Sequence, residues 1–270
     1  MIKKAIIPAA GYGTRNLPIT KVLPKEMFPI GVKPAIQYVI EEALESGIED
    51  ILLVVSRSKN LIVDYFDESL ELEAFLERNN KEHLLSKMQI PKQQLYFTRQ
   101  PYARGLGDAI RIGERFINNE PFAVLLPDDI IMSKGKHGLC ELIDVYKKKQ
   151  SSVIGLKEIE QNMLHQYGVI KGKETKSGIY KMKDIIEKPK KNPPSNLAAV
   201  GRYIFTPAIF SHLNDLQYVA GQEIQLTDAI RKLLINEKCY GKILSGKRYD
   251  IATPKDYLDI INKVHYLNNM

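Results

Sequence analysis

The sequence predicts an α/β protein with three layers, in which a mixed but mainly parallel sheet lies between helices on both faces. Short apolar segments typical of strands alternate with segments of helical periodicity, and this alternation favours parallel pairing. We expect a Rossmann-like sheet with ligands at the carboxyl ends of its strands, where a glycine-rich loop follows the first apolar segment. The predicted strands in this part of the chain are residues 4–8, 50–55, 94–98, 122–126 and 152–156.

Two helical segments follow from the pattern of apolar residues. Residues 34–46 place Ile36, Val39 and Ile40 on one helical face, and Gly47 provides a C-terminal stop. An acidic and then basic stretch at 67–92 predicts a peripheral helical element, not a separate domain.

From about residue 167 onward, strands dominate the predicted structure. They are expected at residues 168–171, 179–187 and 198–205. Thr227 is expected to be the N-cap of a later helix. Thr253 and Pro254 then open an amphipathic helix that runs to the end of the chain.

Composition excludes several classes of function. No apolar stretch approaches the roughly 20 residues that cross a bilayer, so we expect no membrane partner. The N-terminus does not resemble a signal peptide, and two cysteines without metal-type spacing fit a reducing cytoplasm. The net charge is +7, but the lysine runs at 147–149 and 188–191 are typical of solvated surface, so no nucleic-acid partner is expected.

The loop at residues 8–29, PAAGYGTRNLPITKVLPKEMFP, carries the strongest chemical signal. Gly11 and Gly13 allow the main chain to approach a ligand closely, so that backbone N–H groups can bind phosphate. Arg15 and Lys25 add two cations, and three prolines stiffen the segment between and around them. Such a loop suits a triphosphate.

Other interpretations of the loop fit less well. A dinucleotide-binding loop needs a third glycine where this chain has Asn16, and it needs an acid after the second strand, which ends at Ser56. A Walker A loop needs Gly-Lys-Ser/Thr, which this loop lacks. A purely structural glycine turn would leave Arg15 and Lys25 unexplained.

The loop resembles the signature of the sugar-1-phosphate nucleotidyltransferases, GxGTRxxPxTxxxPK. Its continuation, Lys25-Glu26-Met27, is similar to the uridylyltransferase branch of that family. Further blocks match in the family's order across nearly the whole chain: RQxxxxGLG at 99–107, LPD at 126–128, YGV at 167–169, EKP at 187–189, NLAAVGRY at 196–203, EIQLTDA at 223–229 and GKRYD at 246–250. The resemblance implies the fold of the nucleotide-diphospho-sugar transferases.

The resemblance also implies a reaction and a domain organisation. Glucose 1-phosphate would attack the α-phosphorus of UTP, giving UDP-glucose and pyrophosphate, with Mg²⁺ as cofactor. One nucleotidyltransferase domain would span residues 1–270, with a nucleotide-binding half at about 1–150, a sugar-binding half at about 151–250 and a C-terminal helix at 253–270. A homodimer or homotetramer is expected.

By the same resemblance, four residues are catalytic. Arg15 would hold the β- and γ-phosphates, Lys25 would neutralise charge on the triphosphate, and Lys188 would hold the sugar phosphate. Asp128 would bind the metal, because a hard carboxylate at a strand end suits Mg²⁺. Asp250 is its expected partner, although a turn or helix cap is an equally common role for such an aspartate, and Asp129 is the alternative ligand.

The remaining site residues are expected to bind the nucleotide or the sugar, and Gln100 is expected to recognise uracil. The nucleotide-binding residues are Ala10, Gly11, Gly13, Glu26, Gln100 and Gly105, and the sugar-binding residues are Gly168, Glu187, Gly201 and Lys247.

The chain departs from the family pattern at four positions. Val32 replaces an acid, Asp108 replaces the histidine of GlyLeuGlyHis, and Ile251 and Ala252 replace the Cys-Gly that follows the family's aspartate. Two alternatives therefore stay open beside the uridylyltransferase: a catalytically weak UDP-sugar-binding paralogue, and an enzyme of the same fold with another base or sugar.

Overall fold

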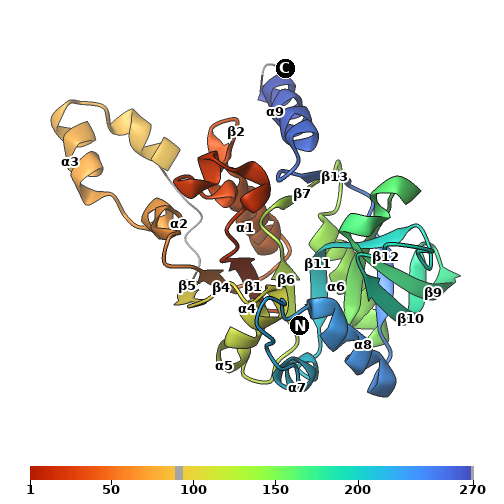
Figure 1. Ribbon diagram of the computed structural model, residues 1–270. Coiled ribbons are helices and arrows are strands. Elements are labelled where there is room, and N and C mark those ends of the chain that lie inside the picture. The colour runs from red at the N-terminus through yellow and green to blue at the C-terminus, as the bar shows by residue number, and fades with distance from the viewer. Residues whose placement is uncertain (89–93, 269–270) are drawn as a thin grey trace.

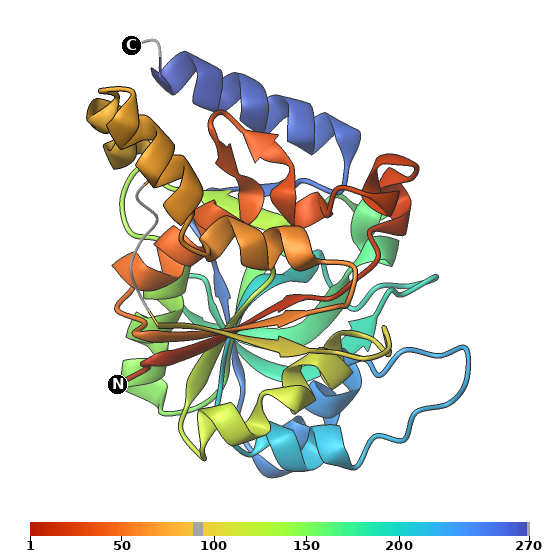
Figure 2. The same ribbon diagram turned by 90° about the vertical axis from the view of Figure 1, so that its left-hand side faces the viewer.

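The computed structural model of the protein describes residues 1–88 and 94–268. Within these residues, nine strands form one sheet in the order β5-β4-β1-β6-β11-β8-β12-β10-β9. Helices cover both faces of the sheet, so the three predicted layers are present (Figures 1 and 2). The strands are β1 (Lys4–Ala9), β4 (Asp50–Val55), β5 (Gln94–Arg99), β6 (Phe122–Leu125), β8 (Val153–Glu158), β9 (Gly168–Lys176), β10 (Ile179–Glu187), β11 (Leu197–Phe205) and β12 (Tyr240–Ile243).

The two halves of the sheet differ in strand direction. Strands β5, β4, β1 and β6 are parallel, as the alternation of strands and helices predicts. Strand β11 runs antiparallel to β6 and β8, and β10 runs antiparallel to β12 and β9. The sheet is therefore mixed, and the prediction that it is mainly parallel is wrong for the second half. Ser177 and Gly178, with φ of +51° and +73°, form the tight turn that makes β9 and β10 a hairpin.

The alternation of side chains along β1 supplies both hydrophobic cores. Ala5 and Ile7 point into one core, whereas Ile6 points into the other. The first core lies against α1 (Ala35–Glu45), α6 (Gly138–Lys149) and α9 (Pro254–Asn268). The second lies against α4 (Leu106–Ile112), α7 (Ile209–Asn214) and α8 (Leu226–Asn236). In Figure 2, α1 and α9 lie above the strands of the sheet, and α4, α7 and α8 lie below them.

Several smaller elements surround this body. Helix α2 (Asn60–Phe66) leads into α3 (Leu70–Arg78), which projects from the body in Figure 1 and is followed by the 3-10 segment η4 (Glu82–Met88). The peripheral helical element predicted at 67–92 corresponds to α3 and η4, and its residues 89–92 lie outside the described residues. The other elements are η1 (Thr14–Asn16), η2 (Ile19–Lys21), η3 (Lys25–Met27), β2 (Pro29–Ile30), β3 (Lys33–Pro34), α5 (Glu114–Ile117), β7 (Asp129–Met132), η5 (Gln161–Gln166) and β13 (Lys247–Asp250).

A two-stranded sheet of β7 and β13 sets the register of the acidic residues. The strands are antiparallel, and Asp129 lies opposite Asp250. Strand β6 ends at Leu125, so Asp128 lies in the turn between β6 and β7. This arrangement places Asp128 at the carboxyl edge of the sheet, as predicted, although on a turn and not on the strand.

The helices near the C-terminus begin close to their predicted positions. Helix α9 begins at Pro254, as predicted, and residues 269 and 270 of the predicted helix lie outside the described residues. Helix α8 begins at Leu226 with Gln225 as its N-cap. The prediction that Thr227 is the N-cap is therefore wrong, and Thr227 lies in the first turn. None of the helices in the described ranges combines the length and apolarity needed to cross a bilayer.

Candidate active site

The glycine-rich loop leaves β1 at the carboxyl edge of the parallel strands. Gly13 has φ +67° ahead of η1, and its carbonyl accepts a hydrogen bond from Thr20 Oγ1 at 2.9 Å. The turn itself therefore favours glycine at this position. Gly11 differs, because it is exposed and a Cβ there would meet no atom within 4 Å. The backbone at Gly11 is thus open to a ligand.

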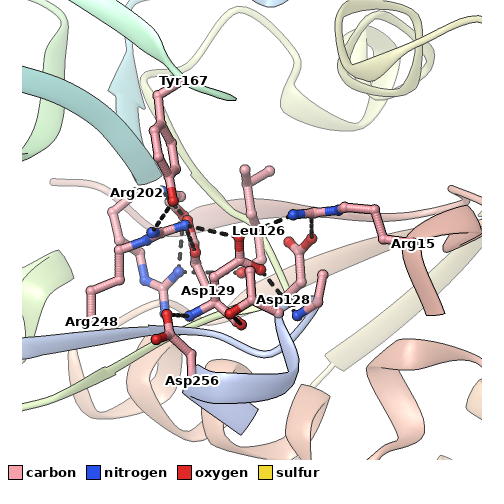
Figure 3. A network of polar contacts seen from close by, with 12 residues as sticks. Arg15, Leu126, Asp128, Asp129, Tyr167, Arg202, Arg248 and Asp256 are labelled. Atoms are coloured by element: carbon pink, nitrogen blue, oxygen red, sulfur yellow. Dashed lines mark hydrogen bonds and ion pairs between the residues drawn. The ribbon is translucent and has the colours of Figure 1, made fainter. Parts of the chain in front are cut away.

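Two predicted cations and two predicted metal ligands meet beside this loop. Lys25 Nζ lies 2.6 Å from Asp128 Oδ2. Arg15 Nη2 lies 3.9 Å from the same oxygen, and Figure 3 shows Arg15 beside Asp128. Arg15 Nη1 lies 3.3 Å from Asp250 Oδ2, so one guanidinium bridges the two carboxylates. Residues from three distant parts of the chain therefore form one charged cluster, which we call the phosphate-side cluster.

The phosphate-side cluster perturbs the pKa values of its own members. Burial alone would raise the pKa of Asp128, but Lys25 and Arg15 lower it to about 2. Burial would lower the pKa of Lys25, yet its acidic neighbours, chiefly Asp128, raise it above the ordinary value. The pKa of Asp250 is raised by burial and by Asp129 and Asp128. A further cation beside Asp250 would stabilise its ionised form.

Both carboxylate oxygens of Asp129 already have partners within the protein. Its Oδ2 accepts a hydrogen bond from the Gly201 N–H at 2.8 Å, and its Oδ1 forms an ion pair with Arg248. A Cβ on Gly201 would lie 2.7 Å from Asp129 Oδ2, so glycine at 201 makes this contact possible. The structure thus gives Asp129 the role of organising the strands around the site.

Asp128 and Asp250, the two carboxylates of this cluster, are the residues that could hold a Mg²⁺ ion. Asp250 Oδ1 accepts the Ala252 N–H at 3.0 Å, and its Oδ2 lies 3.3 Å from Arg15 Nη1 and 3.6 Å from Arg248 Nη2. Asp128 Oδ2 also faces Arg15. In the part of the chain that the structure describes, no three Asp, Glu, His or Cys side chains are arranged to hold a metal. Two carboxylates suffice for Mg²⁺, which takes most of its other ligands from water and phosphate.

A cavity of about 640 Å³ opens beside the phosphate-side cluster. Lys188 reaches it from the end of β10, with Nζ 3.6 Å from Glu187 Oε1. The buried hydroxyl of Thr227, which also lines the cavity, has no hydrogen-bond partner among the described residues. The predicted site residues that line the cavity are Arg15, Asp128, Gly168, Glu187, Lys188, Gly201 and Asp250.

The structure places Lys247 outside the cavity and Arg248 inside it. The Lys247 side chain is 65% exposed, and its Nζ lies 4.0 Å from Asp259 Oδ2. Arg248 lines the cavity, donates a hydrogen bond to the Tyr167 hydroxyl at 3.1 Å and pairs with Asp129 (Figure 3). Sequence reasoning missed Arg248, although side chains two apart on a strand share a face, and Asp250 was already expected in the site.

Arg202 is a second arginine that sequence reasoning missed. It is fully buried, and it pairs with Glu42 through Nε at 3.1 Å and Nη2 at 2.7 Å. Its Nη1 donates to the carbonyl oxygens of Gly201 at 2.9 Å and Leu126 at 3.3 Å (Figure 3). Arg202 therefore anchors the turn that carries Asp128, and although it bonds to two residues of the cavity lining, it does not itself line the cavity.

Glu26 does not line the cavity, because it forms a buried ion pair. Its Oε2 lies 2.5 Å from Lys59 Nζ, and both side chains are at most 4% exposed. Burial lowers the pKa of Lys59, and Glu26 opposes that shift. This pair supports the segment that carries Lys25, and Lys59 was not predicted.

Gln100 lies at the end of β5, on the same edge of the sheet as the glycine-rich loop. Its Nε2 donates to Asp108 Oδ2 at 2.8 Å and to the Gly105 carbonyl at 3.3 Å. Gly105 has φ +104°, and a Cβ there would lie 2.8 Å from the Ile224 carbonyl oxygen, so the fold itself favours glycine. Ala10, at the end of β1, is buried. These nucleotide-side residues do not line the 640 Å³ cavity.

Comparisons with known proteins agree on one family. The family model for nucleotidyl transferases matches residues 4–266. A Bacillus subtilis (strain 168) protein named provisionally as a UTP–glucose-1-phosphate uridylyltransferase is 61% identical over 97% of this chain and 96% of its own length. The UTP–glucose-1-phosphate uridylyltransferase of the same strain is 49% identical over 93% of this chain and 87% of its own. A crystal structure of UDP-glucose pyrophosphorylase complexed with UDP-glucose has a TM-score of 0.88, with 41% identity over 100% of both chains.

Proposed function

The chain belongs to the nucleotidyl transferase family, and we propose that it transfers a uridylyl group from UTP to glucose 1-phosphate, giving UDP-glucose and pyrophosphate. The observation that carries this proposal is the phosphate-side cluster of Arg15, Lys25, Asp128 and Asp250 beside a cavity that Lys188 also lines. The names of the relatives and of the UDP-glucose complex support the same substrates.

The reaction needs alignment and charge neutralisation more than acid–base chemistry. A phosphate oxygen of glucose 1-phosphate forms a bond to the α-phosphorus of UTP. The bond from the α-phosphorus to the oxygen that bridges it to the β-phosphorus breaks, and that oxygen leaves with pyrophosphate and takes the electron pair. The attacking phosphate has a second pKa of about 6, so it is largely a dianion near neutrality and needs no general base. The protein must hold two anionic groups in line.

Arg15 and Lys25 are the proposed cations for the triphosphate. Their charges are directed at Asp128 and Asp250 in the structure, so a phosphate oxygen must compete for these donors. Asp128 and Asp250 would hold a Mg²⁺ ion, which supplies positive charge to the triphosphate when it is bound. The planar Arg15 guanidinium suits the β- and γ-phosphates, and the Lys25 ammonium suits the charge that develops on pyrophosphate.

The sugar phosphate is proposed to bind in the 640 Å³ cavity. Lys188 would pair with its phosphate, and Glu187 would accept hydrogen bonds from sugar hydroxyls. Gly168 lies against Thr227, since a Cβ at 168 would be 2.9 Å from Thr227 Cγ2, so both residues shape the same wall. Arg248 supplies the cation on this side in place of Lys247.

The nucleoside is proposed to bind at the carboxyl ends of β1, β4 and β5. Gln100 would recognise the base, with the backbone of Ala10, Gly11, Gly13 and Gly105 beside the nucleotide. Glu26 contributes indirectly, through its pair with Lys59. We further propose that the enzyme acts in the cytoplasm as a homodimer or homotetramer, without a nucleic-acid or membrane partner.

An assay of pyrophosphate release tests this proposal. The wild-type protein is given UTP, TTP, CTP or ATP in turn, each with glucose 1-phosphate, galactose 1-phosphate or mannose 1-phosphate, with and without Mg²⁺. We expect Mg²⁺-dependent release and the highest kcat/KM for UTP with glucose 1-phosphate. A higher kcat/KM for another pair of nucleotide and sugar phosphate would show that the proposed substrates are wrong. No release from any pair, together with tight UDP-glucose binding, would identify a non-catalytic binding protein.

A further inference from the structure

We propose that Asp108 is a positioning residue that orients the Gln100 side chain so that the nucleotide site accepts uracil and rejects cytosine. This inference rests on the proposed uridylyl transfer and concerns one residue at which the chain departs from the family pattern. Asp108 is buried in the first turn of α4, which begins at Leu106. It acts through Gln100 and is not proposed to touch the substrate.

Three residues form a connected polar chain under the proposed base site. Asp108 Oδ2 accepts a hydrogen bond from Gln100 Nε2 at 2.8 Å, and Asp108 Oδ1 pairs with Arg111 Nη2. The Gly105 carbonyl accepts a second, longer bond from the same Gln100 nitrogen at 3.3 Å. Gln100 and Asp108 are 4% and 5% exposed, so water competes little for these contacts.

The partners of Gln100 determine which end of its amide faces them. The amide nitrogen and oxygen have nearly the same shape, and only their hydrogen-bond partners distinguish them. An ionised carboxylate and a backbone carbonyl are both acceptors without a proton to donate, so both require the NH₂ end. Arg111 carries a permanent positive charge and forms an ion pair with the Asp108 carboxylate. The Gln100 oxygen must therefore point the other way.

The direction of that oxygen sets the base preference. Gln100 Oε1 has no hydrogen-bond partner among residues 1–88 and 94–268, so its acceptor capacity is available to a ligand. Uracil carries an N3–H donor, which matches an acceptor. Cytosine has an unprotonated N3, which would place two acceptors against each other. Rotation of the amide to suit cytosine would turn Oε1 onto the Asp108 carboxylate and the Gly105 carbonyl, and it would lose both bonds.

The test uses Asp108→Asn, which keeps the shape of the side chain. The carboxylate of Asp108 can only accept hydrogen bonds, whereas the amide of asparagine can also donate them. An asparagine at 108 can also rotate and donate its NH₂ group to Gln100 Oε1, so both Gln100 orientations become feasible. Dissociation constants for UTP and CTP are measured by calorimetry without sugar phosphate, for the wild type and for D108N. We expect the preference of the wild type for UTP to fall by about tenfold or more in D108N. An unchanged UTP-to-CTP ratio would overturn the inference.

A double-mutant cycle separates positioning from a general structural role. In a Gln100→Ala background, the added D108N change should leave the UTP-to-CTP ratio within about twofold, because Asp108 then has nothing to orient. An equal loss of preference in both backgrounds would contradict action through Gln100. Glu114→Gln, at an exposed carboxylate beyond the end of α4, is the control and should leave the ratio unchanged.

The design also separates this inference from the proposed function. In steady-state assays, D108N should raise the KM for UTP while the KM for glucose 1-phosphate stays within about twofold, since the sugar side is untouched. If wild-type protein prefers UTP in binding but releases no pyrophosphate, the proposed function fails and the calorimetric test of Asp108 still decides the inference. If the wild type turns over UTP and D108N keeps its preference, only the inference fails.

Discussion

The ion pairs of Arg202 and of Arg15 both join an arginine to carboxylates, but they differ in how many of the guanidinium N–H groups have close protein acceptors. Arg202 and Glu42 are buried, and the Nε, Nη1 and Nη2 groups of Arg202 all have protein acceptors. Arg15 is 53% exposed, and its contacts to Asp250 and Asp128 are longer, at 3.3 and 3.9 Å. A saturated, buried pair holds the fold, whereas a loosely held pair at a cavity can exchange its partners for a substrate.

The largest expected effect is the loss of activity in Asp128→Asn. This change keeps the shape of the side chain but removes the charge that faces Lys25 and, as proposed, Mg²⁺. We expect kcat/KM to fall about a thousandfold or more, in line with the loss of a major electrostatic contact in a transition state, while the protein stays folded. Pyrophosphate release and circular dichroism measure the two effects. Asp144→Asn, in an exposed pair with Lys136, is the control, and near wild-type turnover in D128N would refute the assignment.

The second expected effect concerns stability and not chemistry. Arg202→Met leaves the buried Glu42 carboxylate without its partner, and such a loss costs about 3–5 kcal/mol of unfolding free energy. Chemical denaturation measures it. Arg231→Met breaks the more exposed pair with Asp184 and should cost less than about 1 kcal/mol. Equal losses in the two variants would remove the distinction between saturated and loosely held pairs.

A smaller and more specific effect should distinguish Lys25 from Lys188, because their loss should change different kinetic constants. Lys25→Ala removes charge from the proposed leaving pyrophosphate, so kcat should fall about a hundredfold. Lys188→Ala removes a contact to a phosphate that is charged from the ground state onward, so the KM for glucose 1-phosphate should rise about tenfold, with less effect on the KM for UTP. Initial-rate kinetics measure both, with Lys21→Ala, an exposed lysine in the same loop, as control. A Lys188 variant with equal changes in both KM values would contradict its placement.

The smallest expected effect is on folding stability, to which the ionised carboxylates of Asp128 and Asp250 should contribute with opposite signs. The pKa of Asp128 is lowered from 3.8 to about 2, so its ionised form stabilises the fold above about pH 4 by up to about 2 kcal/mol, and this contribution disappears as the pH falls toward 2. The pKa of Asp250 is raised, so the fold loses stability as the pH rises from the ordinary Asp value through the raised one.

The matching variants expose this difference near neutral pH. Asp128→Asn should lower the midpoint of thermal unfolding, and Asp250→Asn should raise it slightly, although both should lose activity. Differential scanning calorimetry at pH 7 measures the two midpoints. A lowered midpoint in both variants would mean that Asp250 serves the fold as much as the site.

Local sequence features predicted the parallel half of the sheet well, but not the antiparallel half. Alternating apolar segments and helical periodicity located β1, β4, β5 and β6, because a strand, a crossover helix and the next strand form one local unit. The direction of β11 depends on how the chain leaves β10 and inserts β11 between β6 and β8, and no local pattern records that path. The β9–β10 strands were located, but their position beside β12, where β10 also contacts α8, was not predicted.

Within the candidate site, too, some residues were predicted correctly from the sequence and others were not. Arg15, Lys25, Asp128, Asp250 and Lys188 were named from the loop pattern and the family resemblance, and the structure brings them to one cavity or its edge. Lys247 and Glu26 were also named, but the structure turns Lys247 toward Asp259 and pairs Glu26 with Lys59. Their types and positions in a motif do not say which way a side chain points.

By itself, the sequence determined the chemistry of the glycine-rich loop, the alternation that builds the first half of the sheet and the cations available to phosphate. These properties depend on backbone conformation and on neighbours within a few residues. Only the tertiary structure decided that Arg248 pairs with Asp129 while Arg15 reaches Asp250, and that Gln100 donates a hydrogen bond to Asp108. The first choice depends on the register of β7 against β13, whose strands are more than 100 residues apart in the chain. Such a register is set by the packing of the whole fold, because shifting it by one residue would turn every side chain of the strand to the opposite face.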